Sequence, residues 1–435
     1  MLRPYEDLFP RRDTSYKVMT TQSVYIVAAA RTPIGKFGGA LAEFTAPDLG
    51  VIAVRAALER AFGQPLPPPR KPGEAASGSG ARGAWHVDEV IMGNARPAGV
   101  APNPARQIAW RAGLGDDVPA FTINMACASG LRAITLAWQE IRLGQAHIIV
   151  AGGAESMSRV PYLVEGRWGF KMGNQPLVDA MYRDGFLCPL SKLLMGETAE
   201  ILAEQYRISR DEQDAFALES HQRAARAAAE CRFQAEIAAV EKTDKRGNCT
   251  RVEKDEHVRP DVTLEALAKL PPVFSKTGSI SAGNSSGITD GAAAVVLASE
   301  EKVRELKLAP LARIVEASVA AVDPRVMGIA PVPAVRELTQ RTGTNAGNYA
   351  AVELNEAFAA QALACDRDLH FDRARLNPNG GAIALGHPIG CTGARIMTTL
   401  VHRLASDAGR KDRVRGLATL CVSGGMGVAV EIETV

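Results

Sequence analysis

The sequence of 435 residues has no long hydrophobic run. A membrane-spanning helix needs about 18 or more consecutive apolar residues, and no such stretch occurs. The first 20 or so residues mix Arg3, Arg11 and Arg12 with acidic side chains and lack the apolar centre of a signal peptide. We therefore expect residues 1–21 to form a loose tail, and we expect a soluble protein with no membrane partner.

The sequence also lacks an excess of charge of either sign. Fifty basic and 48 acidic residues are mixed along the chain and leave a formal net charge of +2. This balance gives no electrostatic footprint for nucleic acid or for an anionic membrane. Small molecules and further copies of the same chain are the expected partners.

Paired cysteines are absent as well. The seven cysteines are Cys127, Cys188, Cys231, Cys249, Cys365, Cys391 and Cys421. None of them forms a CxxC pair and their spacing is irregular, so the sequence predicts neither a metal site nor a disulfide framework. Free thiols of this kind fit a reducing cytoplasm.

Strand-like and helix-like segments alternate along the chain. An apolar run begins at Val24, a glycine-rich stretch follows it, and a helical pattern begins near Ala46. The segment Pro65–Gly83 is rich in proline, glycine and serine and is expected to be an exposed loop insertion. Further on, a short strand, a helix from about Ala128 to Gly144 and another strand follow, which is the order of an α/β protein.

The same order returns in the C-terminal part of the chain. ARIVEASVA resembles YIVAAARTP, YAAVELNEA resembles DEVIMGNA, ARIMTTLVHRL replaces LRAITLAWQEI, and LATLCVSGG matches IIVAGG. We predict two duplicated βαβαβ halves with mostly parallel sheets: residues 22–155, completed by about 288–309, and residues 310–435. Residues 156–287 are polar and loop-rich and are expected to form an inserted domain. The chemistry should lie between the halves, where strands end and helices begin.

Cys127 follows a predicted strand and begins a predicted helix in INMACASGLRA. The unpaired N–H groups and the dipole at a helix N-terminus favour a negative sulfur, so we predict a lowered thiol pKa and a nucleophilic role. The alternative interpretation is that Cys127 is a small buried apolar side chain.

Three further residues stand in contexts that favour chemistry. His387 lies in the glycine-rich string NPNGGAIALGHPIGCTGAR directly before a helix, where it can act as a base. This string lacks the Gly-Lys-Ser/Thr ending of a nucleotide-binding loop. Cys421 ends a strand before a glycine-rich turn, where it can move a proton while the N–H groups of the turn hold a thioester oxygen. Asn355 also ends a strand, although an asparagine there is more often a helix cap.

Together, these strings are similar in kind and order to those of the thiolase family. The resemblance runs from VYIVAAARTPIGKFGG through CASG, GGAESMS, SAGNSSGITDGAAA, NEAFA and GGAIALGHPIGCTGAR to CVSGGMG. It covers nearly everything after residue 22, and it implies the thiolase fold.

The resemblance implies a role for each of these residues. Cys127 would hold the acyl group as a thioester, His387 would accept the thiol proton, and Cys421 would act as acid and base. His387 and a water held by Asn355 would form one oxyanion hole. The backbone N–H groups of Cys127 and Ser423 would form the other, although the family often has glycine at the position of Ser423.

Binding residues follow from the same resemblance. Asn284, Ser285 and Ser286 in SAGNSSG match the stretch that contacts the pantetheine arm of coenzyme A. Leu194 and Met195 stand in an acyl-pocket position where many short-chain members carry His-Met-Gly, so a different acyl pocket is expected. Coenzyme A and acyl-CoA are expected as substrates, with no permanently bound cofactor, and the protein is expected to be a homodimer or homotetramer.

The function implied is that of an acetyl-CoA C-acetyltransferase, which joins two acetyl-CoA molecules reversibly. The alternative is a broader-chain 3-ketoacyl-CoA thiolase of fatty-acid β-oxidation. A decarboxylating condensing enzyme shares the fold but typically combines one cysteine with two histidines, so Cys421 argues against it. A non-catalytic thiolase-like lipid carrier or scaffold is a rival from another class, but all four catalytic positions are occupied.

Overall fold

The computed structural model describes residues 22–74, 85–243, 246–406 and 413–435. The predicted tail of residues 1–21 lies outside this range, as does the later part of the proline- and glycine-rich segment. Residues 65–74 of that segment form neither helix nor strand and are exposed apart from the buried Leu66 and the half-buried Arg70, as expected of a loop. No helix within the described ranges combines the length and the apolar character needed to cross a bilayer.

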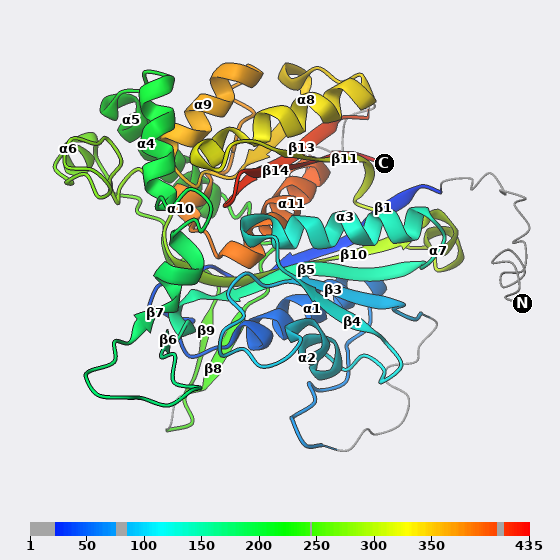
Figure 1. The fold of residues 1–435 in the computed structure, drawn as a ribbon. Coiled ribbons are helices and arrows are strands. Elements are labelled where there is room, and N and C mark those ends of the chain that lie inside the picture. The colour runs from blue at the N-terminus through cyan, green and yellow to red at the C-terminus, as the bar shows by residue number, and fades with distance from the viewer. Residues whose placement is uncertain (1–21, 75–84, 244–245, 407–412) are drawn as a thin grey trace, which may run out of the picture.

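One large sheet runs through the molecule (Figure 1). Its strands are β1 (Val24–Arg31), β3 (Glu89–Gly93), β4 (Ala120–Ile123), β5 (Ile148–Ser156), β10 (Thr289–Ser299), β11 (Ala312–Ala321), β12 (Ala351–Leu354), β13 (Arg415–Val422) and β14 (Met426–Glu433). Their spatial order is β12-β13-β14-β11-β1-β10-β5-β3-β4, and the short β2 (Gly35–Lys36) also pairs with β10. β1 and β11 join the two halves through the pairs Tyr25↔Arg313 and Ile26↔Ala312.

Strand direction only partly agrees with the prediction of mostly parallel sheets. Within each half, all main strands but one run the same way, and the reversed strands are β10 and β14. Each reversed strand lies between two strands of the opposite direction, so most hydrogen-bonded neighbours are antiparallel and the sheet is mixed. The reversed direction of β14 has a local cause. The turn Ser423–Gly425 connects β13 and β14 as a hairpin, and a parallel strand would need a longer crossover connection such as a helix.

Helices cover the sheet in layers (Figure 1). α1 (Ala46–Phe62) and α2 (Pro104–Arg111) lie on the outer face of the first half. α8 (Pro331–Thr342) and α9 (Ala359–Leu369) lie on the outer side of the second half. α3 (Ser129–Arg142) and α11 (Ile389–Ser406) pack side by side between the halves, and α11 is almost entirely buried.

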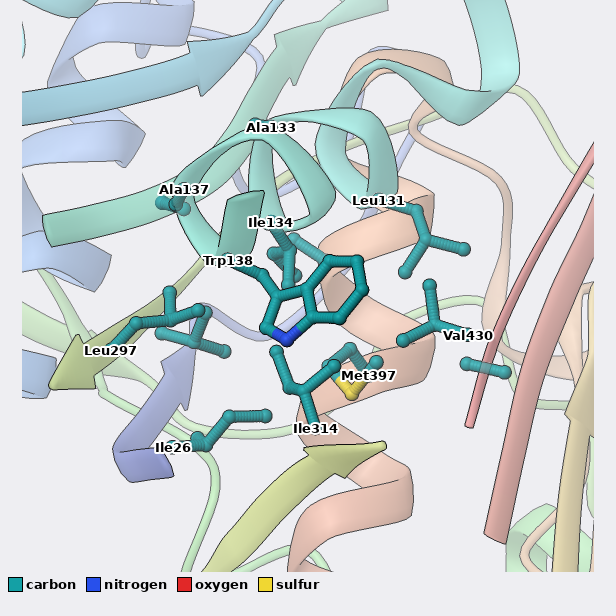
Figure 2. Close-up of a cluster of buried hydrophobic side chains, with 14 of the residues drawn as sticks. Ile26, Leu131, Ala133, Ile134, Ala137, Trp138, Leu297, Ile314, Met397 and Val430 are labelled. Atoms are coloured by element: carbon teal, nitrogen blue, oxygen red, sulfur yellow. The ribbon is translucent and has the colours of Figure 1, made fainter. Parts of the chain in front are cut away.

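The core between the halves is apolar and shared. Figure 2 shows Trp138 of α3 packed among side chains from both halves, with Met397 of α11 and Ile314 of β11 beside it. These residues are almost completely removed from solvent, as is Ile26 of β1. Burial of a large aromatic side chain contributes on the order of 2–3 kcal/mol, so this cluster stabilises the position of α3 relative to α11.

The region between β5 and β10 is partly helical. It contains η3 (Met157–Arg159), β6 (Tyr162–Leu163), β7 (Val178–Asp179), η4 (Tyr182–Phe186), α4 (Met195–Gln205), α5 (Arg210–Ala229), β8 (Val240–Thr243), β9 (Cys249–Val252) and α6 (Leu264–Ala268). α5 begins as the sequence predicted, because the Ser209 hydroxyl accepts from the Glu212 N–H and the Glu212 carboxylate accepts from the Ser209 N–H. The remaining short elements are η2 (Ala126–Ala128), α7 (Glu300–Glu305), η5 (Pro324–Ile329), η6 (Ala346–Asn348) and α10 (Ala382–Leu385).

Candidate active site

Cys127 lies in the short helix η2, between β4 and the first turn of α3. The preceding residue, Ala126, has a left-handed φ of 44°, so the chain turns sharply there. The Ser129 hydroxyl secures this turn by donating to the Ala126 carbonyl at 2.7 Å and accepting from the Met125 N–H at 2.9 Å. Cys127 therefore lies on a fixed corner just before α3.

The prediction of a lowered pKa for Cys127 is wrong for the unliganded protein. Burial raises the pKa of the thiol above its usual value, and the charge of Arg96 and the backbone N–H groups of Ser423 and Cys127 only partly oppose this effect. The helix end is close, but Cys127 is half-buried, and the protein around it disfavours the charged thiolate. Activation therefore requires a base that removes the proton.

Ser423 lies in the turn between β13 and β14, with its backbone N–H directed at the Cys127 sulfur. The two residues after it, Gly424 and Gly425, have φ values of 89° and 85°, whereas Ser423 is not among the residues with positive φ. A serine is therefore unstrained at this position, and its N–H remains available as a donor.

His387 lies directly before α11 and is almost fully buried. Its Nδ1 is 2.6 Å from the Thr392 hydroxyl, which itself donates to the Pro388 carbonyl at 3.0 Å. Because the single hydroxyl proton of Thr392 is used at Pro388, its oxygen accepts from Nδ1–H, and Nε2 carries the lone pair. Nε2 is buried without a partner. Burial lowers the pKa of His387 to about 3, with smaller contributions from Arg395 and Arg96, so the free imidazole is neutral.

Cys421 lies near the end of β13, beside Cys127. Burial raises the pKa of its thiol well above the usual value, and the neighbouring Cys127 adds to this effect. Cys421 is thus a protonated thiol that can act as an acid.

Asn355 follows β12, and its backbone N–H donates to the Thr419 carbonyl of β13 at 3.0 Å. Its side-chain Oδ1 and Nδ2 are both buried without a hydrogen-bond partner. An amide with both polar atoms unpaired in a buried position is unusual, and a water or a ligand oxygen would satisfy it.

Two buried glutamates that the sequence did not indicate hold the site together. Glu155, at the end of β5, accepts from the backbone N–H groups of Ala95, Arg96 and Gly390 at 2.8–3.2 Å and from the Asn94 side chain at 2.9 Å. It therefore ties the loop after β3 to the first turn of α11. Burial raises its pKa, and the charge of Arg96 and these hydrogen bonds oppose the rise.

Glu356 has a similar function in the second half. It accepts from the Ser220 hydroxyl at 2.7 Å, the Asn377 side chain at 2.8 Å and the Ile383 N–H at 3.2 Å. These contacts fix the glycine-rich turn that leads to His387. The only sequence signal was that both glutamates directly follow or end an apolar strand, which gave no partner for either.

The predicted CoA-binding residues differ in what their side chains already do. The Asn284 amide is fully used, because Oδ1 accepts from the Ser281 N–H and Nδ2 donates to Asp214 and to the Ser279 carbonyl. The Ser285 hydroxyl donates to the Ser281 carbonyl. The hydroxyl of Ser286 makes no hydrogen bond to any described residue, and this side chain is half-buried. Asn284 and Ser285 thus shape the turn, while Ser286 presents a free hydroxyl.

The predicted acyl-pocket residues lie at the start of α4. Leu194 precedes the helix and forms an isolated bridge with Leu187, while Met195 packs against the apolar cluster that contains Cys421. A different apolar cluster surrounds Cys127. It consists of Ala95, Met157, Met181 and Ile389, with Val160 and Phe186 packed against it.

The chain matches two family models over most of its length. "Thiolase, N-terminal domain" covers residues 24–65 and 81–301, and "Thiolase, C-terminal domain" covers residues 308–434. Acetyl-CoA acetyltransferase of Pseudomonas aeruginosa is 47% identical over 412 residues, which cover 94% of this chain and 99% of that protein.

Solved structures agree with this match. The acetyl-CoA acetyltransferase of Bacillus anthracis superposes with a TM-score of 0.87 at 42% identity, covering 96% of this chain and 100% of that one. Human mitochondrial 3-ketoacyl-CoA thiolase in complex with CoA gives a TM-score of 0.85 at 41% identity, covering 95% of this chain and 98% of that one. The predicted α/β thiolase fold is thereby confirmed, and the chain belongs to the thiolase family.

Proposed function

We propose that this thiolase is an acetyl-CoA C-acetyltransferase that works through an acyl-enzyme on Cys127. The observation that carries the proposal is a pair of neighbouring thiols in a chain that also buries a neutral imidazole and an unpaired amide. Cys127 and Cys421 are neighbours, and among the described residues His387 Nε2 and both side-chain polar atoms of Asn355 are buried without a partner. Nucleophile, base, acid and oxyanion donors are all available from these groups.

In the first half-reaction, His387 Nε2 accepts the proton of Cys127, and the sulfur attacks the carbonyl carbon of acetyl-CoA. The negative oxygen is stabilised by the N–H groups of Cys127 and Ser423. The bond from carbon to the CoA sulfur then breaks, and Cys421 gives its proton to the departing thiolate. The raised pKa of Cys421 supports this role, because the residue starts as a thiol. The Cys421 thiolate and the His387 imidazolium remain.

In the second half-reaction, the Cys421 thiolate removes a proton from the methyl group of a second acetyl-CoA. His387 and a water held by Asn355 stabilise the enolate oxygen, which lowers the cost of removing a carbon-bound proton. The enolate carbon attacks the acetyl group on Cys127. The Cys127 sulfur leaves, takes the proton of His387 and restores the starting state, with acetoacetyl-CoA as product. The reverse sequence is thiolysis by CoA.

A broader-chain 3-ketoacyl-CoA thiolase of β-oxidation is the second candidate. Leu194 occupies the position where many short-chain thiolases carry histidine, and the cluster around Cys127 is formed largely by flexible or large apolar side chains. Rates of CoA-dependent cleavage across chain lengths separate the two candidates. Cleavage confined to acetoacetyl-CoA supports the acetyltransferase, and rates that persist or rise with longer chains support the broader enzyme.

The test of the proposed mechanism is the Cys127→Ser variant, with Cys249→Ser as a matched control because Cys249 is an exposed free thiol on β9. Mass spectrometry after mixing with acetyl-CoA should show one acetyl group on the parent and on the control but none on Cys127→Ser. Cys421→Ser should still be acetylated, yet turn over slowly, because a hydroxyl is a far poorer acid than a thiol. Full activity of Cys127→Ser would exclude the mechanism, and a parent protein without turnover would favour a non-catalytic carrier.

We further propose that Ser286 contacts the pantetheine arm of CoA, since its hydroxyl is unused. Replacing it with alanine should raise KM for CoA more than it lowers kcat. Asn284 and Ser285 would contribute only through the conformation of the turn, and Leu194 and Met195 would border the acyl site.

Assembly, location and domain limits complete the proposal. An exposed apolar segment between β6 and β7 supports a homodimer or homotetramer. The seven free thiols support a cytoplasmic location. The position of β10 within the sheet of the first half supports the proposed domain limits. These are residues 22–155 with 288–309 for the first half, 156–287 for the inserted domain and 310–435 for the second half.

A further inference from the structure

Arg96 is a buried cation that the proposed mechanism does not use. It lies in the loop after β3, with 7% of its surface exposed. Its Nη1 donates to the carbonyl of the preceding Ala95 at 3.0 Å, while its Nε is buried and has no partner among the residues that the structure describes. No carboxylate of the described residues lies within ion-pair distance of this guanidinium.

The structure makes room for this side chain. A Cβ atom at Gly185 of η4 would lie 2.7 Å from both Nε and Nη2 of Arg96, so only glycine permits the guanidinium to lie against η4. The next residue, Phe186, packs against the apolar cluster beside Cys127, and Ala95 belongs to the same cluster. Arg96 therefore lies at the wall of the apolar site that surrounds the nucleophile.

The guanidinium is also electrostatically close to the reacting groups. Its charge opposes the effect of burial on the pKa of Cys127, and it adds to the effect of burial on the pKa of His387. Two carboxylates, Glu155 and Asp184, interact with the charge of Arg96, but neither lies within ion-pair distance of the guanidinium. Glu155 accepts instead from three backbone N–H groups, including that of Arg96, and from the Asn94 side chain. Glu155 therefore leaves the side chain of Arg96 without a direct partner.

An unpaired donor on a buried guanidinium is costly, because Nε has lost its water and no described protein acceptor replaces it. Arginine presents a planar fork of donors that matches a carboxylate. At the wall of an acyl site, the group that can complete this pairing is one that enters with the substrate.

We propose that Arg96 selects 3-ketoacyl-CoA substrates whose acyl chain carries a carboxylate, which the guanidinium binds while Cys127 attacks the 3-keto carbon. The bond between C2 and C3 then breaks, and the departing acetyl-CoA takes the proton of Cys421. This inference rests on the proposed thiolase activity, and it specifies a substrate class for the second candidate, the broader-chain thiolase, rather than for an enzyme confined to acetyl groups. It also explains why a buried cation lies beside the acyl site, since an acetyl group carries no negative charge that a guanidinium could bind.

The test compares two substrates of six carbons, 3-oxoadipyl-CoA with a terminal carboxylate and 3-ketohexanoyl-CoA without one. The parent protein should give a higher kcat/KM for the carboxylate substrate. Arg96→Leu should lower the ratio of the two kcat/KM values by about 10- to 100-fold, since hydrogen bonds between charged groups contribute about 1.5–3 kcal/mol. Arg96→Lys keeps the positive charge but loses the planar pair of donors, so its ratio of kcat/KM values should lie between those of the parent and of Arg96→Leu.

A second measurement needs no variant. Acylation of Cys127 in the parent protein, followed by mass spectrometry, should be faster with succinyl-CoA than with butyryl-CoA, which has the same number of acyl carbons.

Three outcomes would overturn the inference: a parent protein that prefers the uncharged substrate, a ratio that Arg96→Leu leaves unchanged, or butyryl-CoA that acylates as fast as succinyl-CoA. If Arg96→Leu lowers kcat/KM equally for both substrates and also shifts the pH profile of Cys127 alkylation by iodoacetamide, the role of Arg96 is instead to stabilise the Cys127 thiolate. A parent that cleaves neither substrate and forms no acyl-enzyme would contradict the proposed function itself.

Discussion

The tautomer of His387 depends on one hydroxyl group, that of Thr392 one turn into α11. Thr392 accepts from Nδ1–H and thereby leaves the lone pair on Nε2, which is buried without a partner among the described residues. The carbonyl of Pro388 fixes the direction of the hydroxyl in turn. A base whose proton is placed by a neighbour needs no rearrangement before it reacts.

Thr392→Val should therefore slow catalysis without removing the base. Valine has nearly the same shape but no acceptor, so the imidazole loses its fixed tautomer and Nδ1–H loses its partner. We expect kcat to fall by about tenfold or more, a part of the 10²–10⁴-fold that a positioned base contributes. Thr392→Ser is the matched control, because it keeps the hydroxyl and should restore most of the rate. Equal kcat values for the valine and serine variants would exclude this role.

Single residues were predictable where their local context was unusual. Cys127, His387 and Cys421 stand beside glycines or small residues at strand or helix ends, and the structure places them where these strings predict. Thr392 and Arg96 gave no such signal, because their significance comes from side chains distant in sequence. The repeat of DEVIMGNA in YAAVELNEA could have drawn attention to the loop after β3, where Arg96 lies.

At the scale of elements, α3 and α11 approach each other unusually closely, and glycines make this possible. A Cβ atom at Gly393 would lie 2.3 Å from the backbone nitrogen of Leu131, and one at Gly130 would lie 2.8 Å from the backbone nitrogen of Ala394. α3 begins directly after Cys127, and α11 begins directly after His387. The distance between the helices therefore sets the distance between Cys127 and His387, the proposed nucleophile and base.

Gly393→Ala should separate the two helices and damage both stability and catalysis. The new methyl group would meet backbone atoms, which cannot move aside as a flexible side chain can, and overpacking of this kind typically costs about 1–3 kcal/mol. Urea unfolding should show this loss, and kcat should fall with it. Gly347→Ala is the matched control, because its nearest contacts are at 3.4 Å and 3.5 Å and its φ is not positive. A Gly393→Ala enzyme with unchanged kcat would show that this spacing is not critical.

Element type was largely predictable, whereas strand direction was not. The helix predicted from about Ala128 to Gly144 is α3, and the capping box at Ser209 begins α5 as expected. The apolar run of β10 carries no mark of its direction, because a strand buried on both faces has the same pattern whichever way it runs. Its position between β1 and β5 depends on pairing with segments more than 130 residues away.

At the scale of the whole molecule, the duplication explains why the site is a shared one. α3 of the first half and α11 of the second occupy equivalent places in the repeat and pack together between the two parts of the sheet (Figure 1). Cys127 comes from the first half, while His387, Cys421 and Asn355 come from the second. Neither half alone holds both the proposed nucleophile and the proposed base.

One surface of the chain is unusually apolar. The segment between β6 and β7, together with its flanks, exposes large apolar side chains, and Trp168 and Met172 are each 97% exposed. The other exposed members are Tyr162, Val164, Phe170 and Leu177. Contiguous apolar patches of this kind are rare on monomers and typically mark protein–protein contacts. We therefore expect this segment to bury its apolar side chains against another copy of the chain.

Replacing both Trp168 and Met172 with serine should reduce the oligomeric state. Removing two large apolar anchors from the centre of a contact typically costs several kcal/mol of association free energy, which is enough to dissociate it at micromolar concentration. Light scattering after gel filtration should show a smaller assembly than that of the parent. Leu264→Ser on α6 is the control, because Leu264 is an exposed apolar residue in another element. The proposed catalytic groups lie in another part of each chain, so the smaller assembly should still be acetylated on Cys127. An assembly whose mass is unchanged by the two substitutions would show that the subunits contact each other elsewhere.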